Sequence, residues 1–308
     1  MKVSILTITL LFIFKGLALS QQESLFSQYM FNRLVINPAY AGTKQGLSIT
    51  ALSRLQWTGF DGAPRTGTLS AHAPILQQKH GIGGYVIYDK IGFTAQTGAG
   101  LSYAYRIPTG ENSRLSFGLQ FGASQFKFES NAVTTNEIDD PQFNRGTLSK
   151  MKPLLGAGTF FNTGRFYIGA SALHIIEQKY AYESNAKAKL ARHYYFTAGY
   201  DMYLSKASRD FILSPSVFVR GATGSNWQFD GTLVFMYIQK FWIGTSYRND
   251  DAVVFLAGVY PTKQLRLGYS YDLGMSTFKT YHNGSHEIMI SYDFYKGGPS
   301  DIEVPRLF

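Results

Sequence analysis

Residues 265–273 read Leu-Arg-Leu-Gly-Tyr-Ser-Tyr-Asp-Leu, so apolar or aromatic side chains alternate strictly with small or polar ones. Because successive side chains of a β-strand point to opposite faces, this stretch predicts a strand with one apolar and one polar face. The polar face includes Arg266 and Asp272, which are costly against lipid but tolerated against a wet or packed lumen. The stretch therefore favours a strand in the wall of a membrane barrel.

The same alternation returns along most of the chain. Residues 101–107, 115–122 and 287–294 each place aliphatic or aromatic residues at every second position, opposite mostly small or polar ones. The number of candidate strands is about fourteen, which is even, as in bacterial single-chain barrels. They lie near 46–58, 64–75, 80–91, 95–107, 113–127, 153–162, 165–174, 191–204, 211–220, 227–237, 240–248, 252–261, 264–273 and 285–294.

The composition favours a membrane barrel over a soluble sandwich. Aromatic residues make up 16% of the chain and charged residues only 16%, whereas soluble domains carry roughly 25% charged residues. A soluble β-sandwich would also alternate, but its exposed face would carry more Lys, Glu and Thr. No later segment offers about 18 consecutive apolar residues, so no transmembrane helix is expected. The predicted fold is all-β, a transmembrane antiparallel β-barrel in the outer membrane.

The first residues are typical of a secretory signal peptide. Met1-Lys2 precedes an apolar run over residues 3–14, and Ala18-Leu19-Ser20 supplies small residues before a cleavage site. An anchoring helix is the alternative, but this run is too short to span a bilayer. The chain contains no Cys, so a disulfide framework is excluded. Cleavage is expected after Ser20.

Residues 21–45 do not alternate and differ from everything that follows. Their apolar positions recur at the spacing of one helical face, which predicts a short helix. Pro38 disfavours helix in the residue before it, so this helix should end before Pro38, and residues 39–42 suit a tight turn into the first strand. The segment is predicted to be a plug or a fixed docking element. The residues on the helical face are Leu25, Phe26, Tyr29, Met30, Arg33 and Leu34.

The chain is thus divided into a signal peptide (1–20), a plug-like segment (21–45), a barrel (46–295) and a C-terminal tail (296–308). Two connections between strands are long, near 129–152 and 176–190. Long connections usually lie on the outer side of such barrels and carry recognition, and their orientation here depends on the exact number of strands. The tail has two interpretations, a frayed end or a periplasmic docking peptide.

No pattern in the sequence indicates an enzyme. The six His residues are dispersed, and none shows a metal-ligand spacing. No acid, base and nucleophile are grouped at one end of the predicted strands. Lys and Arg are scattered despite a formal net charge of +9, so a nucleic-acid-binding face is not expected. We therefore expect no catalytic, metal-binding or cofactor-binding residues.

Several motifs resemble the PorP/SprF family of Bacteroidota. The N-terminal signature is Phe26-Ser-Gln-Tyr-Met-Phe-Asn32, Asn37-Pro-Ala-Tyr-Ala-Gly42 and Arg54-x-Gln-Trp57, and the final strand, 284–292, is also similar. The closing Pro305-Arg-Leu-Phe308 is similar to the family's ending, with Leu307 in place of an aromatic residue, and Arg33 departs from a small or apolar residue. The resemblance assigns a partner-binding or plug role to Phe26, Gln28, Tyr29, Met30, Phe31, Asn32, Asn37, Pro38, Tyr40, Gly42, Arg54, Gln56 and Trp57.

The resemblance also implies a function. Members of the family are outer-membrane proteins associated with type IX secretion and gliding motility. They are thought to receive the C-terminal signal domain of a secreted protein, often a large adhesin, and to support its secretion or anchoring at the cell surface. The expected partners are such a cargo, other type IX and gliding components, and membrane lipid. The alternative is a solute channel lined by Arg106, Arg266, Asp272 and Asp293.

Overall fold

The computed structural model of the chain describes residues 26–129, 147–176, 178–179, 189–205 and 210–294. The predicted signal peptide and C-terminal tail lie outside the described residues. So do parts of the two long connections. Among the described residues, no helix combines the length and the apolar character needed to cross a membrane.

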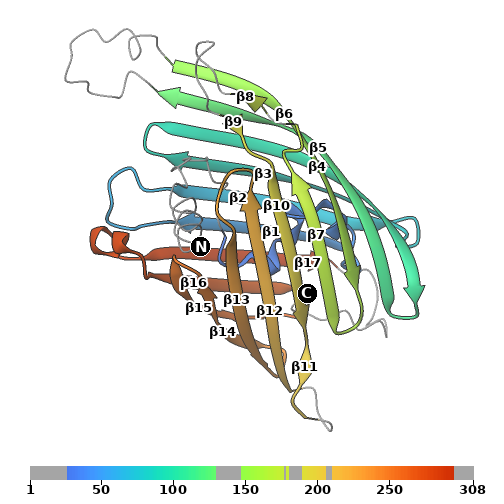
Figure 1. Cartoon of the computed structure of the whole chain (residues 1–308). Coiled ribbons are helices and arrows are strands. Elements are labelled where there is room, and N and C mark those ends of the chain that lie inside the picture. Colours follow the sequence, from blue (N-terminus) through green and yellow to red (C-terminus); the bar gives the residue numbers. More distant parts are fainter. Residues whose placement is uncertain (1–25, 130–146, 177, 180–188, 206–209, 295–308) are drawn as a thin grey trace, which may run out of the picture.

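The described residues form a closed antiparallel barrel of fourteen strands, which confirms the predicted fold class and number of strands (Figure 1). β1 pairs with β17, and β10 pairs with β12, so the sheet has no open end. The wall strands are β1 (Leu47–Leu55), β2 (Arg65–Ile75), β3 (His80–Ile91), β4 (Thr94–Gly110), β5 (Ser113–Glu129), β6 (Thr147–Asn162), β7 (Phe166–Leu173), β10 (His193–Tyr200, continued by β11, Met202–Tyr203), β12 (Phe211–Ala222), β13 (Gln228–Tyr237), β14 (Phe241–Arg248), β15 (Ala252–Val259), β16 (Leu265–Gly274) and β17 (Ser285–Phe294).

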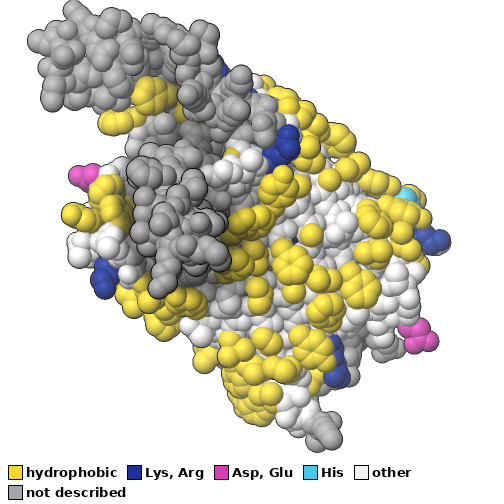
Figure 2. Space-filling view, viewed as in Figure 1, with side chains coloured by type: hydrophobic (Ala, Val, Ile, Leu, Met, Phe, Trp, Pro, Cys, Tyr) yellow, Lys and Arg dark blue, Asp and Glu magenta, His cyan; other side chains and the backbone are white. Residues whose placement is uncertain are grey.

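The two faces of the wall differ as the alternation predicts. Leu101 on β4 is 72% exposed and Ile288 on β17 is 57% exposed, whereas Glu287, its neighbour, is fully buried. Figure 2 shows hydrophobic side chains spread over the outer surface, with few charged ones among them. The apolar face therefore points outward to lipid, and the polar face points into the lumen.

The connections alternate between two rims of the barrel, and the four longest lie on the same rim. These connections are 56–64, 130–146, 174–192 and 275–284. We call the rim that carries them the long-connection rim. A separate two-stranded sheet, β8 (Gln178–Lys179) with β9 (Lys189–Leu190), belongs to the third of them. The opposite rim, the short-turn rim, carries turns such as 76–79, 111–112 and 163–165, and β17 ends there. In such barrels the rim with longer loops faces outward and the rim with short turns faces the periplasm.

The prediction of a single helix that ends before Pro38 is wrong. The described part of this segment contains three short 3-10 helices, η1 (Tyr29–Phe31), η2 (Arg33–Val35) and η3 (Pro38–Tyr40), and Pro38 begins the last of them. An amphipathic helix has one face against a core and one against water. Here the wall surrounds the segment, and the polar side chains of the segment bind wall groups on several sides. The backbone therefore forms short 3-10 turns that satisfy these contacts, and not one amphipathic helix.

Candidate functional site

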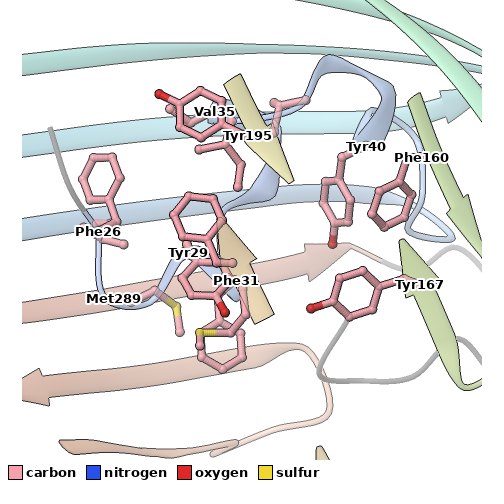
Figure 3. Packing of buried hydrophobic residues seen from close by; sticks show 14 of the residues in the cluster. Phe26, Tyr29, Phe31, Val35, Tyr40, Phe160, Tyr167, Tyr195 and Met289 are labelled. Carbon is pink, nitrogen blue, oxygen red and sulfur yellow. The ribbon is translucent and has the colours of Figure 1, made fainter. Parts of the chain in front are cut away.

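Residues 26–42, which we call the lumenal segment, lie inside the barrel, and every one of them is buried. Figure 3 shows their aromatic side chains packed against the inner face of the wall, with Tyr29 and Phe31 near Met289 of β17, and Tyr40 beside Phe160 of β6. The predicted plug-like residues are thus gathered into one core with the inward-facing side chains of the wall.

One end of the lumenal segment is held by a carboxylate of β17. The two oxygens of Glu287 accept hydrogen bonds from the backbone N–H groups of Ser27 and Gln28, each at 2.8 Å. The Gln28 amide also donates to the backbone oxygen of Glu287 at 3.3 Å. Hydrogen bonds to an ionised carboxylate are roughly twice as strong as neutral ones. Glu287 therefore fixes both the position and the direction of the chain here.

The Ser27 hydroxyl lies between charged side chains from three further strands. It donates to the carboxylate of Asp272, at 2.8 and 2.7 Å from its two oxygens, and accepts from Arg54 at 2.9 Å and Arg248 at 3.1 Å. The same guanidinium groups bind Asp272 directly, at 2.7 Å from Arg54 and 3.1 Å from Arg248. We call Arg54, Arg248, Asp272 and Glu287 the Ser27 clamp.

The clamp is deeply buried, so its charges depend on one another. Arg54 and Glu287 are 3.2 Å apart, and Arg248 also bonds Asp230 of β13 at 3.0 Å. The side chains of Arg54 and Asp272 are only 2% and 3% exposed. Taking a charge out of water is expensive unless it is paired and hydrogen-bonded. The clamp meets this condition by combining opposite charges with the serine hydroxyl and two backbone amides.

The middle of the lumenal segment is held by aromatic contacts on two sides of the barrel. Tyr29 stacks on Phe218 of β12 with ring centroids 4.5 Å apart, and Phe31 packs against Trp242 of β14 at 4.8 Å. Arg33 lies over the ring of Tyr167 at 3.8 Å from its centroid, a cation–π contact. The departure of Arg33 from the family pattern is therefore accommodated by an aromatic face of the wall.

Two asparagines connect the segment to the other side of the wall. The side chain of Asn32 donates to Thr68 at 3.0 Å and accepts from Ser70 at 2.7 Å, both on β2. The side chain of Asn37 caps η3 by accepting from the backbone N–H of Ala39 at 2.9 Å, and donates to the backbone oxygen of Thr159 on β6 at 3.0 Å. Each amide thus uses both of its polar atoms.

The segment leaves the lumen at the short-turn rim. The backbone N–H of Gly42 donates to Nδ1 of His72 at 3.1 Å, and Arg106 donates to the carbonyl oxygen of Gly42. Gly42 has φ +73° and packs against Gly81, so no residue with a side chain would fit easily at either position. Burial lowers the pKa of Lys44, just before β1, while the nearby Asp293 carboxylate acts to raise it.

Several glycines of the wall make room for the lumenal segment, and Gly118 of β5 gives the clearest test. A methyl group at Gly118 would collide with the backbone of Pro38 and Ala39, which cannot move aside as a side chain could. Overpacking of this kind costs about 1–3 kcal/mol. We expect Gly118→Ala to lower the temperature at which the barrel unfolds. Samples are heated to a series of temperatures, and unfolding is read on a gel as conversion of the folded band into the unfolded band. Gly231→Ala is the control, because nothing lies within 4 Å of its added carbon; equal behaviour of the two variants would contradict the packing described.

Two residues of the predicted set lie apart from the others. Gln56 and Trp57 belong to the 56–64 connection at the long-connection rim, and the indole of Trp57 packs against Phe278 of the 275–284 connection at 5.0 Å. Hydrogen bonds of 2.8 Å between Thr58 and the backbone of residues 283 and 284 join the two connections. The predicted site is thus divided into a lumenal part, which includes Arg54, and a rim part.

The alternation predicted the lumenal orientation of Asp272 and Glu287 but not their contact with Ser27. The alternation of residues 241–248 also places Arg248 on the inward face, but its role depends on β13, β14 and β16 meeting at one level of the barrel. The described residues contain no group of three or more His, Asp or Glu side chains arranged to hold a metal ion.

A sequence profile described as type IX secretion system membrane protein PorP/SprF matches residues 18–292. The chain belongs to the PorP/SprF family. This PorP/SprF protein matches no curated protein. The family match and the barrel together identify it as a type IX secretion membrane protein with an outer-membrane barrel fold.

Known structures similar to this PorP/SprF chain are outer-membrane barrels. The translocator domain of the autotransporter NalP from Neisseria meningitidis is 13% identical, with TM-score 0.45, covering 85% of this chain and 94% of that chain. Omp33 from Acinetobacter baumannii is 9% identical, with TM-score 0.46, covering 82% and 100%. A deltaS2S3 mutant of the monoaromatic hydrocarbon channel TodX is 11% identical, with TM-score 0.49, covering 85% and 94%.

Proposed function

We propose that this PorP/SprF protein is a non-enzymatic docking barrel. It binds the C-terminal signal domain of a secreted, adhesin-like partner at the long-connection rim and supports its secretion or its anchoring at the cell surface. The observation that carries the proposal is the lumenal segment, which occupies the interior of the barrel with buried side chains from Phe26 to Gly42. A barrel filled by its own chain suits the binding of a partner at its rim better than the passage of solutes.

The charged residues that a channel would need are used to hold the segment. Arg106 binds the carbonyl of Gly42, and Asp272 binds Ser27. Arg266 lies over the ring of Phe31 at 5.1 Å, and 3.6 Å from Asp293. Selective pores present such charges to a water-filled path. This use of the four residues favours docking over the alternative of a solute channel.

The long-connection rim offers the surface for a partner. β6 pairs with β5 along its whole length, from Thr147 to Asn162, but with β7 only from Gly156 onward, so its first half rises above β7 at this rim (Figure 1). This strand leads out of the 129–152 region, which we assign to cargo contact. Beside β1 and β17, Trp57 and Phe60 pack against Phe278, and Phe60 remains 42% exposed. Aromatic residues are enriched at protein–protein interfaces, and Trp is among the residues most enriched at binding hot spots.

The residues of the family motif then take two roles. Those of the lumenal segment and Arg54 brace and close the barrel, whereas Gln56 and Trp57 contribute to the partner-binding rim. The proposal also includes a role in gliding motility. It divides the chain into a cleaved signal peptide (1–20), a plug segment (21–45), a barrel (46–295) and a periplasmic docking tail (296–308).

Purification of the tagged protein from its own outer membrane in mild detergent tests this function. We expect a large secreted protein to co-purify through its C-terminal domain, along with type IX components. Trp57→Ala should weaken this retention, because truncating an interface hot spot costs about 2 kcal/mol or more, roughly 30-fold in affinity. The bound chains are identified by mass, and their amount is compared at equal amounts of barrel.

Trp227→Ala is the matched control. Trp227 also lies at the long-connection rim and is 52% exposed, but it stacks on Tyr194, which is on the outward, lipid-facing side of β10, away from the 56–64 and 275–284 connections. Its removal should leave retention unchanged. Recovery of the barrel alone, even after crosslinking in cells, would contradict the docking function and favour the channel.

A further inference from the structure

The direction of the lumenal segment can be read from the wall residues that it contacts. Ser27 is held by Arg54, the next-to-last residue of β1, and by Arg248, the last residue of β14. Both strands run from the short-turn rim to the long-connection rim. Ser27 therefore lies toward the long-connection rim, at the level where these strands end.

The other end of the segment lies toward the opposite rim. Gly42 contacts Pro74 and Gly81, which flank the 76–79 turn between β2 and β3. Five residues later the chain enters β1 at Leu47, the end of β1 that belongs to the short-turn rim. Between these ends, the segment contacts β16 through Phe31 and Arg266 and then β6 through Asn37. It crosses the lumen once, antiparallel to β1.

An even number of strands alone would put both ends of the barrel on the periplasmic side. The lumenal segment adds one more crossing, and that makes the total odd. We infer that residues 26–42 carry the chain through the barrel from outside to inside, so that the two ends of the protein lie on opposite sides of the outer membrane. The chain that precedes Phe26 joins it at the outer rim, and the chain that follows Phe294 leaves β17 at the periplasmic rim.

This arrangement assigns the two chain ends to different partners. Ser27 bonds Arg54 and Glu287, which lie next to the ends of the 56–64 and 275–284 connections, so the chain ahead of it belongs to the outer side of the membrane. β17 ends at the short-turn rim, so the chain that follows it belongs to the periplasmic side. The inference rests on the path of the chain through the barrel and holds whether or not the rim binds a secreted cargo.

The absence of Cys from the chain allows a direct test. Single Cys variants are made at Ser24, ahead of the lumenal segment, at Asn226, and at Asn112. Asn226 is exposed in the connection between β12 and β13 at the long-connection rim, and Asn112 is exposed in the turn between β4 and β5 at the short-turn rim. Intact cells are treated with a membrane-impermeant maleimide, and labelling is compared with that of permeabilised cells and of denatured protein.

Ser24→Cys is expected to label in intact cells to the same extent as Asn226→Cys, whereas Asn112→Cys should label only after permeabilisation. A short protease site inserted between Glu23 and Ser24 should likewise be cut by protease added to intact cells. Labelling of Ser24→Cys only after permeabilisation would overturn the inference, since it would put the amino end in the periplasm. Protection in both states, with reaction only after denaturation, would also overturn it.

Discussion

Replacing Arg54 by Ala is expected to destabilise the folded barrel by about 3–5 kcal/mol, the cost of removing one partner from a buried ion pair. Arg54 binds Asp272 at 2.7 Å and Glu287 at 3.2 Å, and both carboxylates are buried. Without the guanidinium, Glu287 keeps the two backbone amides of the lumenal segment, but its charge and that of Asp272 are only partly compensated. The measurement is the denaturant concentration at which half of the purified barrel is unfolded. The folded fraction is read from the folded band on a gel of unheated samples.

Arg65→Ala is the control for this experiment. Arg65 lies opposite Leu55 in the register of β1 and β2, one residue from Arg54, but its side chain is exposed. Exposed substitutions of this kind usually change stability by less than about 0.5 kcal/mol. If Arg54→Ala unfolded at the same midpoint as Arg65→Ala, the clamp would contribute nothing to stability. Glu287→Gln should fall between the two, because it keeps one acceptor oxygen but loses the charge.

Deleting residues 22–42 is expected to convert a sealed barrel into an open one. Barrels of about 8 strands are filled by their own side chains, whereas those of about 16–18 strands leave an aqueous channel. A fourteen-strand barrel is near the upper end of this range, and here its interior is occupied by the lumenal segment. Planar-bilayer recordings should show no stable conductance steps for the full chain and clear open steps for the deletion variant.

The deletion should also abolish retention of the secreted partner, while a heat-modifiable barrel remains. The barrel can persist because the clamp residues Arg54, Arg248, Asp272 and Glu287 still pair with one another, now in a water-filled lumen. Retention of the partner by the deletion variant would mean that the segment is merely a leader. Conductance of the full chain at the level of the deletion variant would show that the segment does not seal the lumen.

The strands could be predicted because their signal is local. Each wall residue faces either lipid or lumen, so alternation such as that of residues 265–273 reports its side directly. The start of β6 was missed by several residues, since it begins at Thr147 rather than near 153. Residues 147–152 carry both Lys and apolar residues, and only pairing with β5 reveals them as a strand.

The lumenal segment could be located from the sequence, but its conformation and partners could not. The helical spacing of Tyr29, Met30 and Arg33 arises because side chains on several sides meet the wall, not because one face meets water. Ser27 and Glu287 are 260 residues apart, and nothing in the local pattern around either of them indicates the other. The contact depends on the closure of the barrel and on its register.

The register of the closing strands places the lumenal segment at the seam of the barrel. Arg54 of β1 stands directly opposite Glu287 of β17, so these two residues flank the seam at which the first and last strands join. Both of them hold Ser27. Ser27 thus bridges the two edges of the barrel, so the seam is completed by a residue that belongs to neither closing strand. A barrel that closed with this segment outside would keep the direct Arg54–Glu287 pair but would lack the bonds through Ser27.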